Sequence, residues 1–165
     1  YGREVLRRDE WTWRNLALGV GSALVLYLVF WLGNQGLVLL SGLLPKGWLN
    51  REANMAAVYA SRGELKALWV GLLLVFPIGF GEELFWRGFI QRFFAARYGA
   101  GKGFVIAACL YTAVHLATGN PVLLVAALTC GLSWGLLYWK SRSLLACLVS
   151  HILWDPLVFV LLPLE

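Results

Sequence analysis

Charged side chains are scarce in this sequence. Only 14% of the 165 residues are Asp, Glu, Lys or Arg, whereas 60% are hydrophobic, and the mean hydropathy is +0.71. Soluble globular domains carry about 25% charged residues, so the composition excludes that class. We expect an all-α fold, a polytopic transmembrane helical bundle. At about 20 residues per span, the length allows about five or six spans in a single membrane-embedded domain, residues 1–165.

Cysteine is rare, and several common motifs are missing. The three cysteines, Cys109, Cys130 and Cys147, lie inside apolar runs without a CxxC spacing. This excludes a disulfide framework or a zinc knuckle and predicts buried small residues. The sequence has no internal repeat and no glycine-rich nucleotide motif. The net charge of +5 comes without a basic stripe, so we expect no nucleic-acid partner.

Stretches without formal charge locate the spans. Residues 15–45 hold the first span, which we expect to end near Asn34, leaving residues 37–44 as a short re-entrant or interfacial segment. The 37 uncharged residues 103–139 are enough for two spans with a turn at residues 118–121. A final span covers residues 143–163.

The middle of the chain is less regular. Residues 46–66 are predicted to form a polar connector containing an amphipathic helix. A second apolar run follows at residues 67–80, where Pro77 and the nearby glycines are expected to kink or break the helix. The helix should then resume and end at residues 99–103.

The distribution of basic residues predicts the orientation in the membrane. The N-terminus, residues 87–102 and the loop 140–142 hold ten Lys and Arg residues, against four in the connector 46–66. Basic residues concentrate on the cytoplasmic side, so we expect the N-terminus inside and the C-terminus outside. Because the chain starts with Tyr1 rather than Met, we also expect it to be a fragment or to lack its natural start.

Two adjacent carboxylates and an arginine interrupt the apolar pattern in the run GEELFWRG, residues 81–88. A charged side chain at a helix centre in the bilayer costs about 2.5 to 3.5 kcal/mol even on lenient scales. On a helix, Glu83 and Arg87 share a face, whereas Glu82 points about 100° away. We therefore expect a structural Glu83–Arg87 pair and a free Glu82.

The later spans contain three more ionisable side chains. His115 follows Tyr111 by one turn, and His151 and Asp155 lie on one helical face. Taken singly, each could be an ordinary core histidine or a helix-internal hydrogen bond. Together they suggest one site, because charges buried in lipid need partners and the nearest partners are one another.

A carboxylate and two imidazoles can perform hydrolysis. The carboxylate can deprotonate a water molecule, and an imidazole can stabilise the oxyanion of a tetrahedral intermediate. The same Glu and two His could instead hold a divalent metal such as zinc. A serine or cysteine nucleophile is less attractive, because the sequence has no Gly-x-Ser-x-Gly.

The order and spacing of these residues resemble a known family. The three motifs of the CAAX protease and bacteriocin-processing (CPBP, Abi) family of intramembrane endopeptidases are similar to Glu82-Glu83-x-x-x-Arg87, Tyr111-x-x-x-His115 and His151-x-x-x-Asp155. The resemblance covers a protease core at residues 67–163. Tyr111 stands where the family frequently has phenylalanine, and Asp155 where it frequently has asparagine.

The resemblance implies roles for these residues. Glu82 would be the general base that activates water, helped by His115. His151 and Asp155 would form or support the oxyanion site. Glu83 and Arg87 would brace the first helix of the core. We favour a glutamate-type protease that requires no cofactor; in the metal-dependent alternative, Glu82, His115 and His151 would hold the metal.

The family also implies partners and a location. Its members process prenylated CAAX proteins, bacteriocin leaders or the sorting tails of surface proteins. We expect a membrane-associated protein or peptide substrate, removal of a leader or C-terminal sorting tail, and a multi-pass place in the lipid bilayer of a prokaryotic cell membrane.

Three competing functions stay open. A proton- or ion-coupled carrier also uses Glu, His and Asp relays, although it would predict inverted repeats. A non-catalytic membrane scaffold could share the fold. Bis-histidine haem binding would need His115 and His151 to face each other across the cofactor.

Overall fold

The computed structural model describes residues 6–43, 50–60 and 63–164, and the regular elements in these ranges are helical. Five helices are long and apolar enough to cross a membrane. They are Trp13–Leu43, Ala67–Tyr98, Ala100–Thr118, Pro121–Ser141 and Leu144–Leu161. The predicted polytopic helical bundle is confirmed, with the lower of the two expected numbers of spans in this part of the chain.

The first span is a single helix, α1 (Trp13–Leu43). The prediction that it ends near Asn34 is wrong. The Asn34 side chain does not interrupt the helix, because its Oδ1 atom accepts hydrogen bonds of 3.0 and 2.6 Å from Arg51 of α2 (Arg51–Ala60). Residues 37–43 therefore continue α1 rather than forming a separate segment. Helix α2 itself confirms the predicted helix in the connector.

The second span is continuous, although its geometry changes along its length. Three α-helical segments, α3 (Ala67–Leu73), α4 (Gly81–Glu83) and α5 (Arg92–Tyr98), are joined by π-helical segments η2 (Leu74–Phe80) and η3 (Leu84–Gln91). Of the kink or break expected near Pro77, the break does not occur, and the helix changes to π-helical geometry at this point. Local π-helical geometry is one way in which a membrane helix re-satisfies the backbone groups that a proline frees.

Three turns connect the remaining helices. Gly99, with φ of 90°, separates α5 from α6 (Ala100–Val114). After η4 (His115–Thr118), Asn120 accepts a hydrogen bond from the Leu123 amide and begins α7 (Pro121–Ser141), as the turn prediction requires. Arg142, with φ of 56°, separates α7 from α8 (Leu144–Pro156), which ends in π-helical η5 (Leu157–Leu161).

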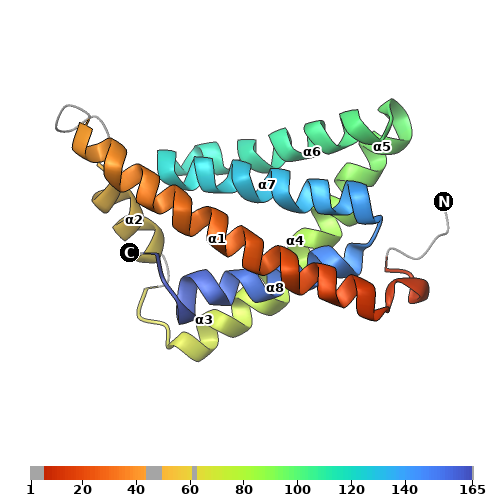
Figure 1. Ribbon diagram of the computed structural model, residues 1–165, viewed down its shortest axis with the longest axis horizontal. Coiled ribbons are helices and arrows are strands. Elements are labelled where there is room, and N and C mark those ends of the chain that lie inside the picture. Colours follow the sequence, from red (N-terminus) through yellow and green to blue (C-terminus); the bar gives the residue numbers. More distant parts are fainter. Residues whose placement is uncertain (1–5, 44–49, 61–62, 165) are drawn as a thin grey trace.

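Helix α8 is the centre of the bundle. It packs against α1 on one side and against η2 on the other, while α6 and α7 run side by side (Figure 1). In its most apolar window, 56% of the residues are buried, compared with 17% for α1. The helix that carries His151 and Asp155 is thus the one most shielded from lipid.

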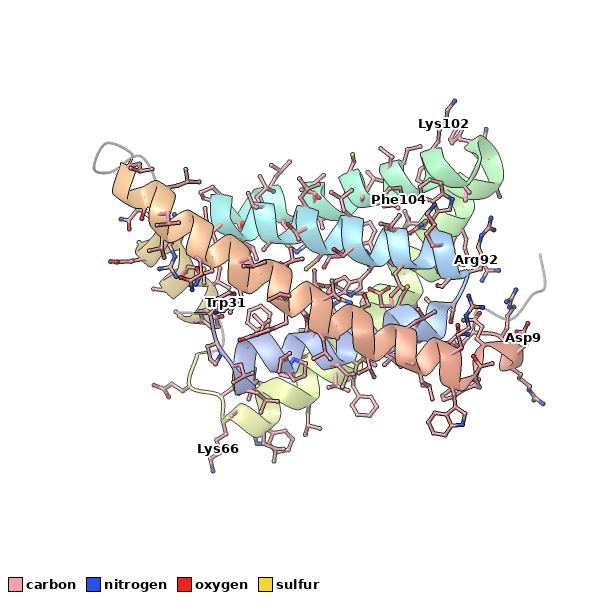
Figure 2. The ribbon with its side chains drawn as sticks, viewed as in Figure 1. Asp9, Trp31, Lys66, Arg92, Lys102 and Phe104 are labelled. Carbon is pink, nitrogen blue, oxygen red and sulfur yellow. The ribbon has the colours of Figure 1, made fainter. Side chains whose placement is uncertain are left out.

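The two ends of the bundle differ. Figure 1 shows η1 (Arg8–Glu10), the α5–α6 turn and the α7–α8 turn at one end, and α2 with the C-terminal end of the chain at the other. Figure 2 likewise places Asp9, Arg92 and Lys102 toward the first end and Lys66 toward the other. The three regions rich in Lys and Arg thus share one end.

Candidate active site

A cluster of four charged side chains lies in the core between α4, η3 and α8. The exposed fractions are 0% for Glu83, 2% for Arg87, 2% for His151 and 4% for Asp155. Glu83 Oε1 accepts a hydrogen bond from Arg87 Nη1 at 2.8 Å and another from His151 Nδ1 at 2.8 Å. Charges this deeply buried are tolerated because each one faces an opposite charge.

Two of the contacts in the cluster follow from helical spacing, and the contact between Glu83 and His151 follows from the packing of two helices. The Glu83–Arg87 and His151–Asp155 pairs are each four residues apart on a helix. His151 Nε2 lies 3.3 Å from Asp155 Oδ2, so both ring nitrogens face a carboxylate. When both carboxylates are ionised, a doubly protonated imidazole balances the cluster together with the guanidinium.

Helix α7 closes the cluster with groups that the motifs do not contain. The Trp134 ring stacks on the His151 ring, with centroids 3.7 Å apart and planes at 19°. Trp134 Nε1 donates to Ser150 Oγ at 3.0 Å, and Arg87 Nη2 donates to the Gly131 carbonyl at 3.3 Å. Trp134 was missed in the sequence, where Gly131, Trp134 and Gly135 at helical spacing were the available signal for close packing around an aromatic ring.

Glu82 lies outside these contacts. It is partly buried, and its Oε2 atom is buried without a hydrogen-bond partner among the described residues. It lies within electrostatic range of Tyr111 and Cys130. Of the two adjacent carboxylates, the structure therefore pairs Glu83 and leaves Glu82 open, as their positions on the helix predicted.

Helix α6 brings Tyr111 and His115 to the same region. The centroid of the Tyr111 ring lies 5.2 Å from Arg87 Cζ. It lies 5.4 Å from the centroid of the Trp86 ring and 5.2 Å from that of the His115 ring. His115 Nδ1 is 2.8 Å from the Tyr111 carbonyl oxygen. Because a carbonyl can only accept, Nδ1 carries a proton, and Nε2 of the neutral ring is left with a lone pair.

The six candidate residues therefore form two groups. Glu83, Arg87, His151 and Asp155 contact one another directly. Glu82 and His115 approach this cluster from the side of Tyr111. In the part of the chain that the structure describes, no three His, Cys, Asp or Glu side chains are gathered as metal ligands. His151 in particular has each nitrogen directed at a carboxylate, so the set Glu82, His115 and His151 is not assembled around one point.

The cysteines differ from one another. Cys130 and Cys147 are buried, as predicted, and Cys147 Sγ lies 3.5 Å from the Trp134 carbonyl oxygen. Cys109 is exposed, contrary to the prediction, because it lies on the outer side of α6. In a membrane that side faces lipid, where a thiol is tolerated as a small hydrophobic group.

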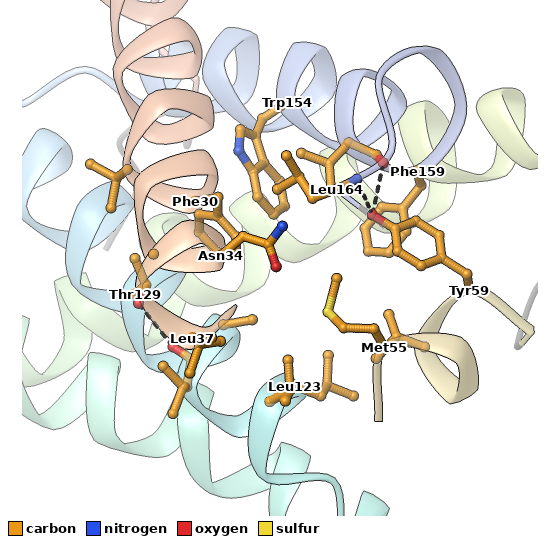
Figure 3. Close-up of a pocket in the computed structure, with 17 residues that line it drawn as sticks. Phe30, Asn34, Leu37, Met55, Tyr59, Leu123, Thr129, Trp154, Phe159 and Leu164 are labelled. Atoms are coloured by element: carbon orange, nitrogen blue, oxygen red, sulfur yellow. Dashed lines mark hydrogen bonds between the residues drawn. The ribbon is translucent and has the colours of Figure 1, made fainter. Parts of the chain in front are cut away.

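An apolar cavity of ≈ 290 Å³ lies between α1, α2, α7 and the end of α8 (Figure 3). Phe30, Leu37, Met55, Leu123 and Phe159 supply apolar walls, and Asn34, Tyr59 and Thr129 supply polar atoms. Trp154 forms part of the wall and meets the Trp134 ring edge to face, at 5.7 Å and 82°. Two tryptophans thus connect the cavity to the histidine of the charged cluster.

Comparison with known proteins supports the resemblance of the motifs. The family model described as type II CAAX prenyl endopeptidase Rce1-like matches residues 64–157, more than half of the chain. This range contains the charged cluster, Glu82 and His115. No curated protein and no solved structure matched the chain. The chain belongs to the Rce1-like family of type II CAAX prenyl endopeptidases.

Proposed function

We propose that this protein is a glutamate-type intramembrane endopeptidase in which Glu82 activates the attacking water. The observation that carries the proposal is the different state of the two adjacent glutamates. Glu83 is fully buried and its Oε1 is bound to Arg87 and His151, whereas Glu82 is partly exposed and neither of its carboxylate oxygens has a hydrogen-bond partner among the described residues. Glu83 Oε2 also lacks a partner, but it belongs to a side chain with no exposed surface. A general base needs a free lone pair next to the reacting centre, and Glu82 has one.

The proposed reaction starts with Glu82 taking a proton from water. The oxygen of that water attacks the carbonyl carbon of the scissile peptide bond and forms a tetrahedral oxyanion. His115 helps to orient the water through Nε2, since its Nδ1 is held by the Tyr111 carbonyl. Glu82 then passes the proton to the leaving nitrogen, the C–N bond breaks, and a carboxylic acid and an amine are released.

The charged cluster stabilises the oxyanion in this proposal. His151 is fixed by Glu83, Asp155 and the Trp134 ring, so it acts through its charge and position. Tyr111 offers a direct donor, because its hydroxyl has no hydrogen-bond partner among the described residues and lies within range of Glu82, Arg87 and Asp155. Donors fixed before the reaction in a dry site stabilise developing charge more strongly than water does.

The substrate that we propose is a membrane-associated protein or peptide from which a leader or C-terminal sorting tail is removed. The apolar cavity beside Trp154 offers a place for an apolar part of such a substrate. A divalent metal such as zinc, held by Glu82, His115 and His151, is the alternative to the glutamate type, and it requires His151 to give up one carboxylate contact.

The direct test compares the protein termini of cells that carry the wild-type chain, Glu82→Gln or the control Glu52→Gln. Glu52 is an exposed carboxylate on α2, so its replacement removes the same charge away from the site. We expect a defined set of membrane or secreted precursors to accumulate uncleaved with Glu82→Gln only, with a loss of at least about 100-fold for the purified enzyme. If Glu82→Gln cleaves as fast as Glu52→Gln, the proposed base is wrong.

A chelator separates the glutamate type from the metal-dependent type. We expect the purified wild-type protein to keep its rate of peptide cleavage after dialysis against a chelator. In the alternative, the rate falls and returns on addition of zinc, because the metal would supply the nucleophile. An inactive preparation that zinc restores would reject the glutamate type.

A further inference from the structure

A second cavity, of ≈ 550 Å³, opens at the end of the bundle that holds η1, α5 and the α7–α8 turn. Three arginines from separate elements line it, together with one carboxylate and one phenol: Arg7, Arg92, Arg142, Glu10 and Tyr138. It lies apart from the charged cluster and from the apolar cavity beside Trp154. None of its residues takes part in the proposed hydrolysis.

The carboxylate in this cavity is already bound within the protein. Glu10 is 4% exposed, and its Oε2 accepts hydrogen bonds from Ser143 Oγ at 3.2 Å and from the Leu145 amide at 3.0 Å, at the start of α8. Its Oε1 lies 3.5 Å from Arg7 Nε. The Glu10 charge is thus directed at α8 and Arg7, and Arg7 Nε also lies 3.1 Å from Asp9 Oδ1. Arg142, on the α7–α8 turn, contacts neither of these carboxylates.

Arg142 is placed for a ligand rather than for a partner in the protein. It is exposed and is the only residue other than glycine with positive φ, 56°, in the described chain. Its side chain makes no ion pair or hydrogen bond with another described residue. Its backbone angle is that of a helix C-cap, where its N–H donates to the Tyr138 carbonyl. Its side chain, in the lining of a cavity that Arg7 and Arg92 also line, favours an anion there.

The position of the cavity indicates where that anion comes from. At the same end, Trp11 and Trp13 are 64% and 87% exposed, and Lys140 Nζ lies 4.7 Å from the Trp139 ring centroid. Exposed tryptophans beside basic residues mark the level of the lipid headgroups. At that level the abundant anion is the phosphodiester of a phospholipid.

We propose that this cavity binds the headgroup of an anionic phospholipid. Guanidinium groups bind phosphate oxygens in a bidentate manner, and the Tyr138 hydroxyl adds a neutral donor. Small side chains on α5, Ala95 and Ala96, leave room for the glycerol. Basic pockets between transmembrane helices are common sites for such headgroups.

A lipid in this place would join the helices that carry the site. Arg92 belongs to the same continuous helix as Glu82, and Arg142 lies between α7, with Trp134, and α8, with His151. A phosphate bridging Arg92 and Arg142 holds these helices together at their common end. The inference does not depend on the proposed chemistry.

The test is the thermal unfolding of the purified full chain in detergent with phosphatidylcholine, with and without phosphatidylglycerol. We expect phosphatidylglycerol to raise the Tm of the wild-type protein by about 5 °C at saturation. The rise should fall to less than half in Arg142→Gln and in Arg142→Asn, the latter tolerating the left-handed backbone. It should stay complete in the control Lys102→Gln, because Lys102 points away from Arg92 on the outer end of α6 (Figure 2).

Three results would overturn the proposal. The first is an equal rise in Tm with additional phosphatidylcholine. The second is an equal loss of the rise in Lys102→Gln, which would mean diffuse surface charge rather than a site. The third is an equal rise with inorganic phosphate alone, which would assign the cavity to a free anion. A variant counts only if its Tm without phosphatidylglycerol stays within a few degrees of the wild-type value.

Discussion

Glu82 and Glu83 are adjacent in the sequence but have different surroundings, because successive side chains on a helix point about 100° apart. Glu83 faces α8 and is neutralised by Arg87 and His151. Glu82 faces the side of Tyr111 and is left open. Glu83 therefore has a structural role in the core, and Glu82 has the catalytic role in the proposed reaction.

Arg87 is the residue whose loss should cost most stability. Arg87→Ala leaves Glu83 buried with one partner fewer and removes the bond to the Gly131 carbonyl. Breaking a buried ion pair costs about 3 to 5 kcal/mol. We expect the Tm of purified protein to fall by roughly 10 °C.

The matched control is Arg97→Ala, because Arg97 is exposed on α5 and its side chain makes no ion pair or hydrogen bond with another described residue; its guanidinium lies 6.0 Å from the Tyr98 ring centroid. Its Tm should stay within about 2 °C of the wild-type value. Equal Tm values for the two variants would mean that Arg87 contributes nothing to the fold.

The span Ala67–Tyr98, which contains both glutamates, includes two π-helical segments. Segments η2 and η3 flank the three residues of α4, so the carboxylates stand between two widened turns. π-Helical turns are rare in proteins, and those that occur are often found at functional sites. Pro77 is accommodated in the first of them, and the chain can present Glu82 and Glu83 from a rigid helix rather than from a loop.

The contact between α1 and α8 depends on a glycine. A Cβ added at Gly19 would lie 2.6 Å from Val149 Cβ and 2.8 Å from the Ala146 carbonyl oxygen, whereas one at Gly21 would meet nothing within 4 Å. Gly19→Ala should therefore cost about 1 to 3 kcal/mol by forcing the helices apart, and Gly21→Ala should be neutral or slightly stabilising.

Thermal unfolding of the two variants checks this prediction. Both replace one hydrogen by a methyl group in the same helix, so intrinsic helix propensity cancels in the comparison. A Tm for Gly19→Ala at or above that of Gly21→Ala would show that α1 and α8 can separate without cost.

At the scale of the whole molecule, the basic residues and the number of spans predict the orientation in the membrane. An odd number of spans, as with the five candidate helices, predicts that the two ends of the described chain lie on opposite sides of a membrane. The end with η1, α5 and the α7–α8 turn holds most of the Lys and Arg residues of the described chain. We therefore predict that this end is cytoplasmic.

Reporter fusions test the orientation. A green fluorescent protein fused to the N-terminus should fluoresce, and alkaline phosphatase fused to the C-terminus should be active. The reciprocal fusions should both be silent, because each reporter works on one side of the membrane only. The inverse pattern would contradict the orientation predicted from charge.

Local interactions explain most of what could be predicted. The spans follow from uncharged runs, the turn at residues 118–121 from Gly119 and Asn120, and the Glu83–Arg87 pair from spacing alone. The helix end expected near Asn34 and the break that was one of the two alternatives at Pro77 do not occur, for different reasons. The Asn34 side chain is bonded by Arg51, 17 residues away, and Pro77 is absorbed by a π-helical segment. Tertiary contacts and a change of helix type overrode the local signals.

The sequence by itself determined the membrane class, the helical bundle and the identity of the residues that carry charge into the core. The composition and the spacing of the charged residues decide these features. A helix that crosses the lipid must be long and apolar, and an unpaired charge in the bilayer core is costly. Only the tertiary structure decided that His151 binds Glu83, 68 residues earlier, and that Trp134 stacks on it. Such contacts join residues on different helices, and the packing of α7 and α8 sets them rather than any spacing along the chain.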